Sequence, residues 1–96
     1  MIITKGVAVG EVVTLKLVTG EELIAKLTDI SDNDYKVTRP LMLVIGSQGL
    51  GLQPWLLSVE STRAIKIPKE RVIAIEPTIK EMSTQYLAGT SGIALA

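Results

Sequence analysis

The strongest constraint on the fold is a stretch of alternating side chains that ends at a glycine. In residues 12–18, "VVTLKLV", one side of the chain carries Val13, Leu15 and Leu17, and β-branched residues are frequent. This period of two is typical of a β-strand. Thr19-Gly20 follows, and glycine readily adopts the positive φ that a short hairpin turn needs. A strand needs a neighbour for its backbone hydrogen bonds, so we expect the next segment to return beside it.

That next segment, residues 21–30, fits two patterns. "ELIAKLTDI" alternates as a strand does, but Leu23, Ile24, Leu27 and Ile30 also follow helical spacing. Thr19-x-x-Glu22 matches a helix capping box as well. The pattern alone leaves strand and helix close to even, and the strand and glycine turn before it favour a hairpin.

The remaining segments predict a mostly β domain with one short helix. In chain order we expect a turn at 31–34, a strand at 35–45, a mobile loop at 46–54, short strands at 55–60 and 64–67, a turn at 68–71 and a strand at 72–75. Pro40 cannot donate to a sheet ladder, which implies an edge position or a bulge. After Pro77 the period becomes helical. A capping box at Thr78-x-x-Glu81 and an apolar face predict a helix over 78–88, with Ile79, Met82, Tyr86 and Leu87 on that face. Gly89 is expected to end it, followed by a tail at 89–96.

Composition limits the classes of function. The 96 residues form a single domain, 1–96, and ten cations balance ten anions, so no net charge attracts nucleic acid or anionic lipid. The chain has no cysteine and no histidine, which removes disulfides and the commonest general base and metal ligand. It is 47% apolar with only three aromatic residues, and this aliphatic excess favours self-association over a monomer. We read no secretion signal and no membrane-spanning run, and therefore expect a cytoplasmic protein without membrane contact.

The acidic segment around residues 29–34 is the first candidate for chemistry. Its spacing is similar to that of a calcium loop, but Asp34 stands where the turn glycine is needed and Pro40 where the bidentate glutamate is needed. We therefore interpret the acids as part of a turn and predict no metal site. No paired acid and base can be assigned, and neither Ser47 nor Ser58 has a histidine to activate it, so we predict no enzyme and no cofactor.

The segment "IKIPKERV" is the basic feature that remains. Lys66, Lys69 and Arg71, with Arg63 nearby, could form a cationic rim, and the alternative is a solvated loop whose charges face Glu60 and Glu70. In a symmetric ring each cation recurs once per subunit, which would turn a modest patch into a groove for a polyanion.

The order of these elements resembles that of the Sm-like superfamily, which includes LSm proteins and Hfq. The likeness lies in "VTLKLVTGEELIAKLTDISDNDYKV", which is similar to the first Sm motif, with "IKIPKERVIAI" in place of the second, and covers about residues 11–76. It implies a small, strongly bent, five-stranded open barrel of the SH3 type. It also implies a ring of five to eight identical subunits, in which the fourth strand of one pairs with the fifth of the next, and which binds short single-stranded RNA at its lumen.

The resemblance also implies which residues would contact RNA. Tyr35 would stack on a base, Lys36, Lys69 and Arg71 would hold phosphates, and Asn33 is a further candidate. The chain departs from the family in three places: the Met-Asn pair of the first motif is absent, Pro68-Lys69 replaces the Arg-Gly pair of the second, and the predicted helix follows the strands. The acidic turn would repel phosphates, which leaves open an assembly module that contacts only protein partners, through the 46–54 loop and the tail.

Overall fold

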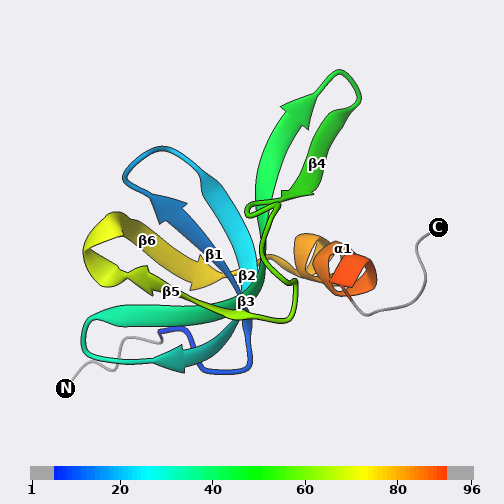
Figure 1. Cartoon of the computed structure of the whole chain (residues 1–96). Coiled ribbons are helices and arrows are strands. Elements are labelled where there is room, and N and C mark those ends of the chain that lie inside the picture. The colour runs from blue at the N-terminus through cyan, green and yellow to red at the C-terminus, as the bar shows by residue number, and fades with distance from the viewer. Residues whose placement is uncertain (1–5, 91–96) are drawn as a thin grey trace.

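The computed structural model describes residues 6–90 as one antiparallel sheet and a C-terminal helix (Figure 1). The elements are β1 (Val12–Leu17), β2 (Glu22–Ile30), β3 (Asp34–Gly46), β4 (Gly49–Pro54), β5 (Ala64–Pro68), a 3-10 turn η1 (Lys69–Arg71), β6 (Val72–Pro77) and α1 (Lys80–Thr90). The predicted class, mostly β with one short C-terminal helix, is confirmed. Of the predicted tail at 89–96, Gly89 and Thr90 belong to α1, and 91–96 lie outside the described residues.

The ambiguous segment 21–30 is a strand. β2 pairs antiparallel with β1 in a register that places Leu15 opposite Leu23 and Val13 opposite Ala25. All four side chains are fully buried, and with Leu27 they form the centre of the core. Gly20 has φ 107° in the turn between the strands, the positive angle expected of a hairpin glycine.

β3 is long enough to serve two partners in succession. The sheet order is β4-β3-β2-β1-β6, and β5 also pairs with β3. β5 lies against residues 34–38 of β3, and β4 lies against residues 41–46. The sheet does not close on itself, and it has six strands, whereas the resemblance to the Sm-like superfamily implies five.

Two predictions about the middle of the chain were wrong. Residues 46–54 were expected to be a mobile loop, but β3 and β4 form a hairpin there that projects away from the rest of the sheet (Figure 1). Residues 55–60 were expected to be a strand and are irregular instead. Trp55 leaves the sheet at this point, where its N–H donates to the Pro40 carbonyl at 3.0 Å and its side chain packs against the core.

Pro40 lies at a β-bulge, as its lack of a backbone donor predicted. Ile24 pairs with Leu41 and Lys26 with Thr38, so that Arg39 and Pro40 together oppose the single residue Ala25. Arg39 adopts φ 50°, an angle that non-glycine residues rarely take. The bulge bends β3 between the part that pairs with β5 and the part that pairs with β4.

α1 begins at Lys80, two residues after the predicted start. The Thr78 hydroxyl bonds the Thr14 hydroxyl at 2.8 Å, and the Thr78 N–H donates to the Val12 carbonyl, which fixes the entry to the helix against β1. Of the predicted apolar face only Tyr86 is buried, whereas Ile79 and Leu87 are exposed. The helix continues through Gly89, the residue expected to end it.

Within residues 6–90, no helix has both the length and the apolar character needed to span a bilayer.

Candidate nucleic-acid interface

The acidic segment forms the tight turn between β2 and β3. The Ser31 N–H donates to the Asp34 carbonyl at 2.9 Å, and the Asp34 N–H donates to the Ser31 hydroxyl oxygen at 3.1 Å. A serine that bonds the backbone in this way stabilises a turn locally. Among residues 6–90, no three carboxylates gather closely enough to hold a metal ion.

This turn lies beside the one that joins β5 to β6. The Lys69 N–H donates to the Asn33 carbonyl at 2.8 Å, and Asp34 pairs with Pro68 across the adjacent strands. Residues 34 and 36 positions apart in the chain are therefore held together by backbone pairing. The predicted residues Asn33, Tyr35 and Lys69 lie in one cluster as a result.

Lys69 covers one side of the Tyr35 ring. Its ammonium nitrogen lies 5.3 Å from the ring centroid, within the range of a cation–π interaction. Tyr35 pairs with Ile67, is half-buried and packs against the core, so its ring is held firmly at the end of the sheet. A base can stack on an exposed aromatic ring, and a cation beside the ring can bind the phosphate of the same nucleotide.

Lys36 lies on the other face of the sheet. Successive side chains of a strand point to opposite sides, so Lys36 faces away from the core that Tyr35 and Val37 contact. Its cross-strand partner is Lys66, and the two lysines share a hollow of about 160 Å³ with Asp29, Ser31 and Asp34. The structure thus separates Lys36 from the Tyr35–Lys69 pair.

Arg71 stands at the far end of η1. Its side chain is exposed, and its carbonyl accepts a hydrogen bond from the Val18 N–H at 2.9 Å. This bond ties η1 to the β1–β2 turn. Arg71 therefore lies two residues beyond Lys69, near a different turn from the one that carries Asn33.

Lys66, in the basic segment, is a candidate for anion binding that was not among the RNA contacts predicted from the sequence. The sequence placed it in a cationic rim, and the strand pairing puts it directly opposite Lys36. Two like charges in a directly opposed pair repel each other and favour an anion between them. The alternation of "AIKI" predicted the strand that carries Lys66, but it did not indicate that this strand pairs with β3.

Comparison with protein-family models gives no match for this sequence, and comparison with curated proteins gives none either.

Proposed function

We propose that this protein is a non-enzymatic, Sm-like subunit that assembles into a homo-oligomeric ring and binds single-stranded RNA. The observation that supports the binding site is the cluster of Asn33, Tyr35 and Lys69, which two turns bring together through the bond from the Lys69 N–H to the Asn33 carbonyl. An aromatic ring beside a cation is the minimal platform for one nucleotide, with the base on the ring and the phosphate on the ammonium group.

In this proposal the base takes the place of the Lys69 side chain over Tyr35. The released ammonium group then pairs with the phosphate of the same nucleotide, so that one charge serves both the free and the bound state. Arg71, which is exposed two residues beyond Lys69, holds a neighbouring phosphate. Lys36 and Lys66 contribute attraction from the opposite face, where Asp29 and Asp34 reduce it.

Ring formation is supported by two strand edges. β5 pairs only with β3 and β6 only with β1 among residues 6–90, so each presents one unpaired edge. Unpaired edges attract other strands, and pairing of β5 with the β6 of a neighbouring subunit would remove both. Ile73 on β6, which is 65% exposed, would be covered by the same contact.

Fluorescence anisotropy with labelled oligo-U and oligo-A at two salt concentrations tests RNA binding. We expect binding that weakens as salt rises, because phosphate contacts release counterions. Light scattering at the same protein concentrations tests the ring. A protein that stays monomeric, or an anisotropy that does not respond to either oligonucleotide at low salt, would contradict the corresponding half of the proposal.

A ring that binds only protein partners is the second candidate. The observation that favours it is the pair of carboxylates, Asp29 and Asp34, that share the hollow with Lys36 and Lys66. Carboxylates at this position lower the affinity for phosphate. A ring that forms in solution but gives no anisotropy signal with either oligonucleotide would support this function over RNA binding.

A further inference from the structure

The β3–β4 hairpin differs in composition from the rest of the chain. None of the ten cations and ten anions falls between Leu41 and Val59, a stretch of 19 residues. The hairpin formed by residues 41–54 extends beyond the body of the sheet (Figure 1). An exposed apolar element without charged side chains is unfavourable in water, and such surfaces often mark interaction sites.

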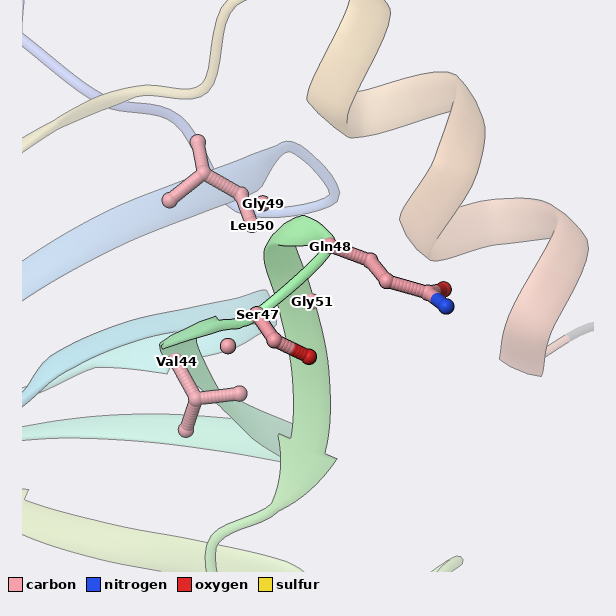
Figure 2. Close-up of a pocket in the computed structure, with 7 residues that line it drawn as sticks. Val44, Ser47, Gln48, Gly49, Leu50 and Gly51 are labelled. Carbon is pink, nitrogen blue, oxygen red and sulfur yellow. The ribbon is translucent and has the colours of Figure 1, made fainter.

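The two faces of the hairpin are unlike each other. Leu43 pairs with Leu52 and Ile45 with Leu50, which places four aliphatic side chains on one face. Ile45 is 84% exposed and Leu50 is 58% exposed. Figure 2 shows Leu50 and Val44 pointing to opposite sides of the hairpin.

The opposite face carries few side chains near the tip, because three of its four residues there are glycines and the fourth is Val44. Gly51 pairs with Val44 and Gly49 with Gly46, so little side chain covers the backbone there. An open hollow of about 380 Å³ remains at the tip, lined by residues 46–51 together with Val44 (Figure 2).

The free edge of β4 offers a defined set of hydrogen-bonding groups. The two-residue turn makes Gly46 and Gly49 a hydrogen-bonded pair, so the backbone groups of Gly51 also point toward β3. Those of Leu50 and Leu52 point outward, and β4 has no other partner strand within residues 6–90. Pro54 follows in the same alternation, so the N–H it lacks would also have pointed outward, and it limits the free edge to this short stretch.

We propose that this edge pairs with the β4 strand of a second copy of the chain, antiparallel, about a two-fold axis at Gly51. Leu50 of each copy then opposes Leu52 of the other. Each such pair exchanges two hydrogen bonds, so the N–H and C=O groups of both residues in both copies are all used. The aliphatic faces of the two hairpins join into one apolar surface on a four-stranded sheet.

A second copy fits this edge better than an unrelated partner for two reasons. A two-fold contact places each patch against itself, which a charged patch resists and an uncharged one does not. The free groups are also symmetric about Gly51, whose missing side chain leaves room at the axis. Each copy contributes one strand of six residues, so we expect a buried area below the roughly 800 Å² per partner of a standard stable interface and association that depends on protein concentration.

This contact is separate from the proposed ring, which uses β5 and β6. Subunits can pair through β4 whether or not they form rings or bind RNA. If rings do form, each ring carries several hairpins, and their simultaneous pairing strengthens the contact between two rings.

A single-cysteine variant tests the register directly. The chain has no cysteine, and a Cβ at Gly51 would meet nothing closer than a Val44 methyl group at 3.7 Å. Across the two-fold axis Gly51 faces its own copy in a non-hydrogen-bonded pair, where the Cα atoms lie about 4.5 Å apart, a distance that suits a disulfide. We expect Gly51→Cys to form a disulfide-linked dimer under mild oxidation at least tenfold faster than Leu57→Cys, which is 85% exposed but lies outside the hairpin.

The second measurement is the molar mass in solution by light scattering over a range of concentrations. Leu50→Lys places a charge at the edge, which natural edge strands use to prevent pairing, and we expect the mass of the largest species to fall to half. Leu57→Lys is the matched control and should leave the mass unchanged. Equal oxidation rates for the two cysteine variants, or an unchanged mass for Leu50→Lys, would overturn the proposal and assign the edge to a different protein's strand or to none.

Discussion

The hydroxyl group of Tyr86 in α1 accepts a hydrogen bond from the backbone N–H of Lys26 in β2, at 3.1 Å. The single proton of the same hydroxyl is shared between the carbonyls of Thr38 and Arg39, each at 3.0 Å. These backbone groups lie at the bulge of β3, where the ladder between β2 and β3 is interrupted. One side chain from the helix therefore replaces the bonds that the bulge removes, and Arg39 adds a bond from its guanidinium to the Thr90 carbonyl. The helix is therefore fixed to the sheet at the bulge.

Removing only this hydroxyl should destabilise the fold. Tyr86→Phe keeps the buried ring but leaves the Lys26 N–H without its partner, and a buried unsatisfied group costs about 1–3 kcal/mol. We expect a loss of this size in the free energy of unfolding, measured with urea. Tyr35→Phe is the control, because the Tyr35 hydroxyl makes no hydrogen bond with the described residues, and its effect should be near zero. Equal effects of the two substitutions would contradict the role assigned to Tyr86.

The same hydroxyl predicts how stability depends on alkaline pH. Burial raises the pKa of Tyr86 above its ordinary value of 10.0, while the Lys26 N–H and the charge of Arg39 partly oppose the shift. Because the folded-state pKa is the higher one, the stabilisation is complete below pH 10 and is lost as the pH rises through the folded-state pKa. Urea unfolding between pH 8 and 11 should show a steeper decline for the wild type than for Tyr86→Phe. Parallel curves would mean that other groups, such as the lysines, account for the decline.

Much of this arrangement could be predicted from particular residues. The alternation of residues 12–18 and Gly20 predicted the first hairpin, and Pro40 predicted an edge position or a bulge, of which the structure has the bulge. β4 was missed because its glycines are typical of a loop. Leu50 and Leu52 nevertheless alternate with Gly49 and Gly51, which is the period of two expected of a strand. The cluster at the candidate site depends on the pairing of β3 with β5, a long-range contact that no local pattern determines. The resemblance to Sm motifs predicted that Tyr35, Lys36 and Lys69 would contact the same RNA, but it did not predict that Lys36 lies on the opposite face of the sheet.

Replacement of glycine by alanine should have opposite effects on stability at Gly20 and at Gly89. Gly20 has φ 107°, so Gly20→Ala should destabilise the protein by about 1–2 kcal/mol even though nothing lies within 4 Å of the added Cβ. Gly89 lies inside α1 with open space around it, and Gly89→Ala should stabilise the protein by up to about 1 kcal/mol. Urea unfolding of both variants measures the difference. The same sign for both would show that the turn or the helix differs from this description.

The fluorescence of Trp55, the only tryptophan of the chain, should change at acidic pH when Glu21 is protonated. Hydrogen bonds from the Thr19 hydroxyl and from backbone, with a further one from the Trp55 indole N–H at 3.4 Å, lower the pKa of Glu21 below its ordinary value of 4.5. A lowered pKa means that this stabilisation is present above pH 4.5 and is lost as the pH falls through the folded-state pKa. We expect a change in Trp55 fluorescence with a midpoint below 4.5 that is absent in Glu21→Gln. A transition that persists in this variant would come from other carboxylates.

The charge of Lys69 should determine the salt dependence of RNA binding. Lys69→Met keeps an unbranched side chain over the Tyr35 ring but removes the ammonium group, so the ring stays covered while the phosphate contact is lost. For single strands, each lost contact reduces the slope of log K against log salt by about 0.7. Anisotropy with oligo-U at several salt concentrations should therefore give a smaller slope and weaker binding at low salt. Lys80→Met on α1 is the control, since its exposed side chain lies on the helix rather than at the two turns. If both variants reduce binding equally, the attraction arises from total charge, and the cluster of Asn33, Tyr35 and Lys69 is not the site where RNA binds.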